Sequence, residues 1–143
     1  MKRLMQTLIL LATLTTLPAT AQQAMEFDGY TIHYNALSSS LITPEVAQAY
    51  GISRSDSRAL INISVLKKNS DAARASVTAT GRNLTGQTRQ VEMREVNEGD
   101  GAIYYIGELS VRNMETFDFT VLVTPQGNNK PYTVKFRQQF YTE

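Results

Sequence analysis

Histidine-dependent catalysis in this chain would have to use His33, because the sequence contains a single histidine. Three consecutive serines, Ser38, Ser39 and Ser40, follow it closely and could supply a nucleophilic hydroxyl. A serine hydrolase also needs a carboxylate that orients the histidine, and often a glycine-flanked turn that presents the serine. Neither is recognisable around these serines. We therefore interpret His33 as an ordinary surface or hydrogen-bonding histidine.

The candidate binding chemistry lies in a compact polar run, Arg54-Ser55-Asp56-Ser57-Arg58. Two arginines can hold a carboxylate or a phosphate through paired, charge-assisted hydrogen bonds. We therefore take Arg54, Asp56 and Arg58 as the candidate binding residues, with a protein or peptide as the partner. The alternative is a solvated loop whose local ion pairs contribute little to stability.

Acidic residues offer two further kinds of chemistry. Glu92, Glu108 and Asp118 could supply the carboxylate pair of a glycan-acting enzyme, but their positions in alternating runs predict that they lie outside and scattered. A second group surrounds one turn and could suggest calcium: Glu95, Asn97, Glu98 and Asp100. This group lacks the spacing of an EF-hand loop, so we interpret it as a solvated turn.

The sequence has no cysteine and one histidine. These counts exclude disulfides, thiol catalysis, iron–sulfur clusters and zinc sites made of several cysteines or histidines. We expect no stoichiometric transition metal and no cofactor. The absence of catalytic groups favours a protein that is not an enzyme.

The first 21 residues have the three parts of a secretory signal. Lys2 and Arg3 are followed by an uncharged, largely apolar run over residues 4–17, then by Pro18 and the small-x-small sequence Ala19-Thr20-Ala21. A membrane-spanning helix needs about 20 apolar residues, and this run is shorter. We therefore expect cleavage after Ala21, no integral membrane segment after processing, and a periplasmic location.

Cleavage would leave 122 of the 143 residues, which suits one domain over residues 22–143. Removal of Lys2 and Arg3 lowers the 14 basic residues to 12, against 13 acidic ones. The formal charge then changes from +1 to −1. There is no net basic field to attract nucleic acid or anionic lipid.

The mature chain alternates polar and apolar residues, as strands with one buried face do. About seven such runs occur, at residues 30–35, 61–65, 75–79, 90–94, 103–111, 117–123 and 134–140. Residues that favour turns separate the later runs, at 81–86, 98–101, 112–115 and 125–131. The pattern predicts an all-β, antiparallel, immunoglobulin-like sandwich. A small closed barrel is the alternative.

The first inter-strand connection is much longer than the others and contains a helix signal. Thr43 can cap a helix, Pro44 suits its first position, and Gly51 suits its left-handed stop. We expect Val46, Tyr50 and Ile52 to dock this short helix on the sandwich. Long ordered connections often carry function, so residues 37–58 are either a recognition surface or a structural cover for one end of the sandwich.

Several motifs together resemble a family of small exported proteobacterial proteins, catalogued only as a domain of unknown function. In the first half these are His33-Tyr34-Asn35-Ala36, Thr43-Pro44-Glu45-Val46-Ala47, Tyr50-Gly51-Ile52 and Arg54-Ser55. Further motifs continue to Tyr105: Asn62-Ile63-Ser64-Val65, Asn83-Leu84-Thr85-Gly86-Gln87 and Glu98-Gly99-Asp100-Gly101-Ala102-Ile103-Tyr104-Tyr105. The resemblance covers essentially the whole mature chain. It implies an immunoglobulin-like sandwich in a gram-negative periplasm, and no activity.

Three functions follow as hypotheses. The first is a non-enzymatic periplasmic module that binds a protein or peptide. The second is a small-ligand or lipid binder, and the third is a carboxylate-dependent glycan-acting enzyme. A closed core without a cleft would favour the first, an empty apolar cavity the second, and converging acids the third.

Overall fold

The computed structural model describes residues 23–142, so the expected signal at residues 1–21 lies outside the described part. Two antiparallel sheets form the fold. Sheet A has the strand order β1-β2-β3-β7-β6, and sheet B has the order β5-β4-β8-β9. The elements in chain order are β1 (Gln23–Phe27), β2 (Tyr30–Ser38), the 3₁₀ turn η1 (Ser39–Leu41), α1 (Pro44–Tyr50), β3 (Arg58–Lys67), β4 (Ala75–Asn83), β5 (Thr88–Val91), β6 (Arg94–Asn97), β7 (Ile103–Ser110), β8 (Glu115–Pro125) and β9 (Tyr132–Phe140).

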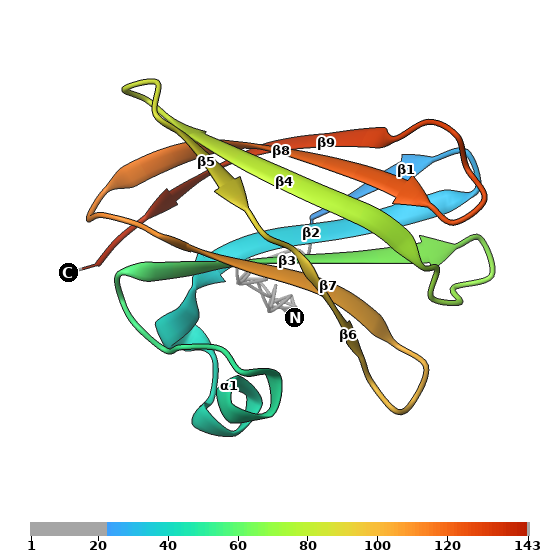
Figure 1. Ribbon diagram of the computed structural model, residues 1–143, viewed down its shortest axis with the longest axis horizontal. Helices are drawn as coiled ribbons and strands as arrows, with labels where there is room; N and C mark the ends of the chain where they lie inside the picture. The colour runs from blue at the N-terminus through green and yellow to red at the C-terminus, as the bar shows by residue number, and fades with distance from the viewer. Residues whose placement is uncertain (1–22, 143) are drawn as a thin grey trace, which may run out of the picture.

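The two sheets pack face to face around the main core (Figure 1). Alternation decides which side chains enter it: Phe117, Phe119, Val121 and Val123 of β8 are at most 1% exposed. Their outward neighbours Asp118 and Leu122 are exposed. The predicted all-β sandwich with one short α-helix is therefore confirmed, and the sheets do not close into a barrel.

The described part has nine strands where about seven were expected. β1 is an additional strand that pairs with β2 through a turn at Gly29, whose φ is 78°. The run predicted as one strand at residues 90–94 divides into β5 and β6, which belong to different sheets. The long connection with α1 consequently joins β2 to β3.

Gly107 allows the chain to cross between the sheets after β5. A Cβ at Gly107 would lie 2.6 Å from both Val91 Cγ1 and Met93 Sδ, and 2.9 Å from the backbone oxygen of Glu92. These contacts are too short for any side chain. The absence of a side chain on β7 therefore lets residues 91–93 pass close over the strand.

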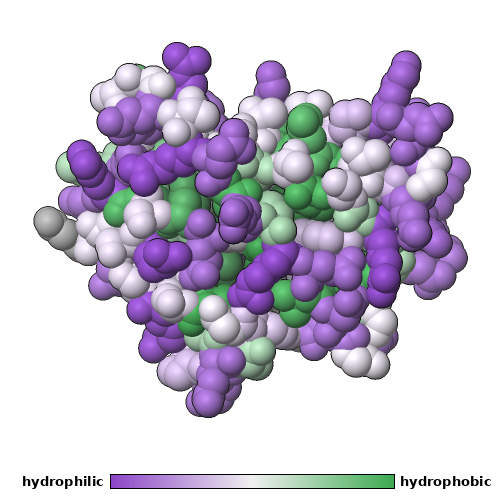
Figure 2. All heavy atoms as spheres, in the orientation of Figure 1, coloured by the Kyte–Doolittle hydropathy of each residue, from purple (hydrophilic) through white to green (hydrophobic). Residues whose placement is uncertain are grey.

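A second, smaller core lies on the outer face of sheet A, where α1 covers part of β3, β7 and β6 (Figure 1). It consists of Ala47, Ile52, Leu60, Val96 and Ile106. Polar side chains cover most of the face seen in Figure 2, with apolar groups visible between them. Neither helix within residues 23–142 has the length and apolar character needed to cross a membrane.

Candidate functional site

α1 has the local signals that the sequence predicts. Thr43 Oγ1 accepts a hydrogen bond from the backbone N–H of Val46 at 3.3 Å, and Pro44 occupies the first turn. Gly51 ends the helix with a φ of 65°, and the N–H of Ile52 donates to Ala47 O at 2.8 Å. These caps fix both ends of a helix that is too short to be stable alone.

The docking of α1 differs in part from the expectation. Ala47 and Ile52 are buried and Tyr50 is half-buried, whereas Val46 is 41% exposed. The small side chain of Ala47 faces the sheet, which brings the helix close and places Val46 at its edge. Arg94 of β6 fastens the end of the helix, because its Nη2 donates to the backbone oxygen of Tyr50.

The loop after α1 is fixed by a buried hydroxyl, that of Ser39 in η1. Ser39 Oγ lies 2.8 Å from the backbone oxygen of Ser53 and 3.0 Å from that of Ser55, and it accepts the N–H of Ser55 at 3.0 Å. Ser39 is fully buried. It joins the two ends of the connection, so residues 39–55 form a closed, ordered unit on the sandwich.

The structure does not bring the three predicted binding residues together into one site. Arg54 Nε donates to Ile42 O at 2.6 Å and Arg54 Nη2 to Ser40 O at 3.2 Å, so this guanidinium holds the connection itself. Arg58 lies at the start of β3, with its Nε 3.7 Å from Glu108 Oε1. Asp56 is exposed and lines a separate hollow between β2 and the end of β9.

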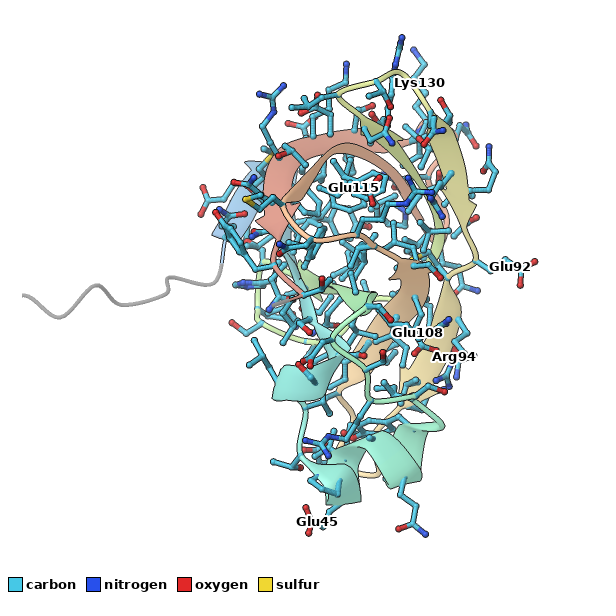
Figure 3. All side chains as sticks on the ribbon, turned by 90° about the vertical axis from the view of Figure 1, so that its left-hand side faces the viewer. Glu45, Glu92, Arg94, Glu108, Glu115 and Lys130 are labelled. Carbon is cyan, nitrogen blue, oxygen red and sulfur yellow. The ribbon has the colours of Figure 1, made fainter. Side chains whose placement is uncertain are left out.

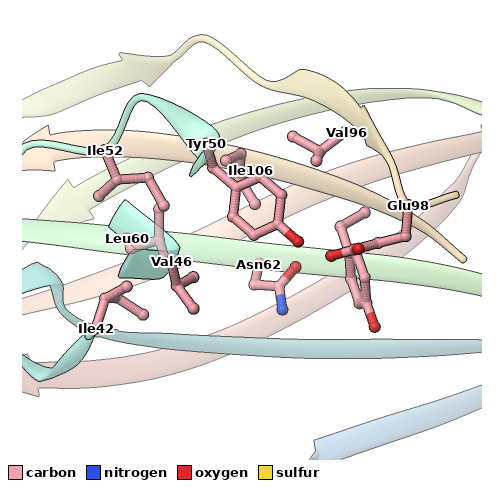
Figure 4. A pocket seen from close by; sticks show the side chains of 10 residues that line it. Ile42, Val46, Tyr50, Ile52, Leu60, Asn62, Val96, Glu98 and Ile106 are labelled. Carbon is pink, nitrogen blue, oxygen red and sulfur yellow. The ribbon is translucent and has the colours of Figure 1, made fainter. Parts of the chain in front are cut away.

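A cleft of about 370 Å³ lies between α1 and the outer face of sheet A, and we call it the α1 cleft (Figure 4). Aliphatic side chains make up most of its wall: Ile42, Val46, Ile52, Leu60, Val96 and Ile106. The pairing of β3 with β7 places Asn62 beside Ile106 in the floor of the cleft. The remaining lining residues are Tyr50, Asn62, Glu98 and Tyr104.

The polar groups gather at one end of the α1 cleft. Figure 4 shows the Tyr50 hydroxyl and the Glu98 carboxylate both pointing into the space above Asn62. Asn62 Oδ1 is buried and has no hydrogen-bond partner among the described residues. An unpartnered buried oxygen costs stability. An apolar cleft with a few converging polar groups is the usual form of a small-molecule site.

His33 lies on the same outer face, as its position in the alternation predicts. Its Nδ1 is buried without a partner in the described part of the chain. A hollow of about 20 Å³ adjoins it, and Asn62 and Tyr104 line both this hollow and the α1 cleft. The serines expected near His33 have other roles, because Ser39 secures the loop and Ser38 Oγ lies 2.8 Å from Ser40 Oγ.

Of the three acids that were expected on strands, Glu108 lies on β7 and Asp118 on β8, whereas Glu92 lies in the link between β5 and β6. Asp118 of sheet B forms a bidentate pair with Arg137, at 2.7 and 3.0 Å, and these hydrogen bonds lower the pKa of Asp118. Glu108 accepts the N–H of Ser53 at 3.2 Å. Glu92 lines a hollow of about 340 Å³ with Glu108, but Figure 3 shows its side chain projecting from the edge of the molecule.

Among the described residues, no three or more His, Cys, Asp or Glu side chains are grouped so that they could hold a metal ion. Glu95 is occupied by hydrogen bonds from Asn97 at 3.1 Å and Tyr105 at 3.0 Å, and these lower its pKa. Asp100 Oδ1 accepts the N–H of Ala102 at 3.1 Å. Of the residues around this turn, Glu98 lines the α1 cleft.

Sequence reasoning missed the sheet side of the α1 cleft. A signal was present, because Leu60, Val96 and Ile106 are apolar at positions whose parity points away from the main core. Apolar residues on the outer face of a strand indicate that another element covers them. Packing of the predicted helix against these three residues would place a cleft between the helix and the sheet.

Comparisons with known proteins agree with this architecture. The family described as "Domain of unknown function (DUF4426)" matches residues 24–143. A crystal structure of a DUF4426 family protein from Pseudomonas aeruginosa PAO1 is similar to this chain, with a TM-score of 0.74 and 32% sequence identity. The similarity covers 85% of this chain and 95% of that protein. No curated protein matches the sequence. The chain therefore belongs to the DUF4426 family.

Proposed function

We propose that this protein is an exported, non-enzymatic binding module whose ligand is a small amphipathic molecule held in the α1 cleft. The observation that carries the proposal is the lining of this cleft, which is largely apolar but has the Tyr50 hydroxyl and the Glu98 carboxylate pointing into one end. A ligand could form hydrogen bonds at this polar end while its apolar part covers Leu60 and Ile106.

Three further observations support this reading over the alternatives. Asp118 lies on the opposite sheet from Glu108. Glu92 and Glu108 line one hollow, but the Glu92 side chain projects from the edge of the molecule, which disfavours a two-carboxylate enzyme. The core between the sheets is filled by Phe117, Phe119 and Phe136, which disfavours a lipid lumen inside the sandwich. Export is supported by the signal pattern of residues 1–21.

A titration with 2-phenylethanol tests the proposal, because this alcohol combines an aromatic body with one hydroxyl. Two-dimensional NMR should show shifts concentrated at residues that line the α1 cleft. Val46→Trp places a bulky group at the exposed rim of the cleft and should abolish these shifts. Leu122→Trp is the matched control, since Leu122 is similarly exposed, at 39%, on sheet B.

Shifts that are scattered over the surface, or that survive in Val46→Trp, would count against the cleft as the site. Thermal unfolding of both tryptophan variants shows whether either substitution has disturbed the fold.

A second candidate function, contact with an extended peptide, is favoured by the hollow that Asp56 lines. This hollow measures about 1020 Å³ and runs between the end of β2 and the end of β9. β1 starts at Gln23, opposite Tyr34, so no described strand flanks residues 35–38 of β2 on that side. Exposed Leu41 and Tyr141 border the hollow, at 72% and 61% exposure. An added strand could pair with such an edge.

Selection from a displayed heptapeptide library tests this second candidate. Selected peptides should bind the protein and lose affinity when Leu41→Asp and Tyr141→Asp are combined, while Leu122→Asp leaves binding unchanged. Peptides that bind all three proteins equally would exclude this hollow as their site.

A further inference from the structure

We propose that the ligand of the α1 cleft carries a cationic amine on its apolar body, an inference that rests on the proposed function of this cleft. The ligand class is an alkyl- or arylalkyl-ammonium group. The ligand is a free amine of this kind, in keeping with the small molecule proposed for the cleft.

The charge of the lining gives the first reason. Glu98 is the one charged residue among the ten that line the α1 cleft, and its carboxylate points into the cleft (Figure 4). Arg94, the arginine of β6, does not line the cleft and is directed to the backbone oxygen of Tyr50. An anionic ligand would therefore meet a carboxylate with no cation in the lining, whereas an ammonium group meets an opposite charge.

Hydrogen-bond capacity gives the second reason. The polar end of the cleft offers the carboxylate of Glu98 and the hydroxyl of Tyr50. Both groups can accept hydrogen bonds, and an ammonium group has three donors and no acceptor. A neutral alcohol supplies one donor and cannot satisfy these acceptors together.

The fold holds Glu98 in place for this contact. Glu98 begins the hairpin between β6 and β7, where its N–H donates to Ala102 O at 2.8 Å and its own backbone oxygen accepts the N–H of Gly101 at 3.1 Å. The side chain is half-buried. A carboxylate on a fixed backbone and partly sheltered from water attracts a cation more strongly than one on a free surface loop.

Three probes of similar size and different charge test the proposal: 2-phenylethylamine, 2-phenylethanol and 3-phenylpropanoate. Dissociation constants are measured by NMR titration at neutral pH and low salt. We expect the amine to bind about tenfold more tightly than the alcohol, and the carboxylate to bind most weakly. Glu98→Gln should lower the affinity for the amine to that for the alcohol and leave the alcohol unaffected.

Glu92→Gln is the matched control, because Glu92 is an exposed acid outside the cleft lining. It should keep the preference for the amine. Equal binding of amine and alcohol in the cleft would overturn the cationic class but leave the cleft as a binding site. A preference that survives Glu98→Gln would likewise overturn it. Failure of all three probes to bind would reject the proposed function itself.

Discussion

The guanidinium Nε of Arg54 lies 2.6 Å from the backbone oxygen of Ile42. Ile42 precedes α1 in the sequence, and Arg54 follows it. Its Nη2 reaches Ser40 O at 3.2 Å, so one side chain binds two carbonyl groups of the segment that enters the helix. Arg54 was expected to face a partner. It instead links the start and the end of the connection, beside the similar link made by Ser39.

This arrangement predicts that Arg54 contributes to stability. Arg54→Ala should lower the free energy of unfolding by about 1–2 kcal/mol, because two charge-assisted hydrogen bonds are lost at an exposed site. Asp56→Ala, which removes an exposed side chain of the same loop, should change it by less than about 0.5 kcal/mol. Urea unfolding measures both. Equal and negligible effects would show that Arg54 is free to serve recognition, as the sequence suggests.

The close crossing at Gly107 gives a second prediction. Gly107→Ala places a methyl group within 3 Å of Val91, Met93 and the backbone of Glu92, and overpacking of this kind costs about 1–3 kcal/mol. Gly99→Ala is the control, because nothing lies within 4 Å of a Cβ at that position. Chemical denaturation should separate the two variants. If Gly107→Ala is as stable as the parent, the crossing between β5 and β6 is looser than described.

Tyr105 connects three strands through its hydroxyl, which accepts the N–H of Ala75 at 2.8 Å and donates to Glu95 at 3.0 Å. Burial raises the pKa of Tyr105; the hydrogen bond from Ala75 opposes this rise, and Glu95 adds to it. A raised folded-state pKa stabilises the fold below the unfolded-state value of about 10. That contribution is lost as the pH rises through the folded-state pKa.

Tyr105→Phe should therefore cost about 1–2 kcal/mol at neutral pH and remove part of the fall in stability at alkaline pH. The pKa of Glu95 should rise, since it loses one of the hydrogen bonds that lower it. Tyr141→Phe, at an exposed position, should change neither the stability at neutral pH nor its dependence on alkaline pH. Melting temperatures measured from neutral to strongly alkaline pH decide this, and identical alkaline profiles for parent and Tyr105→Phe would refute it.

Much of the sandwich could be predicted from alternation alone, because a strand buried on one face repeats every two residues. The buried face of β8 and the caps of α1 depend on local sequence, and the structure confirms both predictions. The split between β5 and β6 could not be read, because Val91 and Met93 keep the alternation while the chain changes sheets. That change depends on Gly107, a residue distant in sequence.

The candidate site was harder to predict for the same reason. Arg54, Asp56 and Arg58 are close in sequence and chemically suited to binding. In the structure, Arg54 is bonded to the segment before α1, Arg58 lies near Glu108 of β7, and Asp56 lines the hollow beside the end of β9. The α1 cleft combines residues of α1, β3, β6 and β7. No short motif brings these residues together, so their proximity follows from the register of sheet A.

Asn62 allows a test of whether an unpartnered buried oxygen in the floor of the α1 cleft lowers the stability of the fold. Asn62→Leu removes a buried oxygen that lacks a described partner, so the variant should be about 1 kcal/mol more stable than the parent. Asn83→Leu is the contrast, because Asn83 Oδ1 accepts the N–H of Gln87 at 2.8 Å and its loss should cost at least about 2 kcal/mol. A destabilised Asn62→Leu protein would mean that Asn62 is already satisfied in solution.

The most direct test of the α1 cleft as a binding site is to locate a bound probe by intermolecular nuclear Overhauser effects. With 2-phenylethylamine in excess, we expect contacts from its aromatic protons to the methyl groups of Ile52, Leu60 and Ile106, with its ammonium end toward Glu98. All of these contacts should disappear in Val46→Trp and persist in Leu122→Trp. Contacts confined to Leu41 and Tyr141, or an absence of any contact to Ile106 at saturation, would contradict the account.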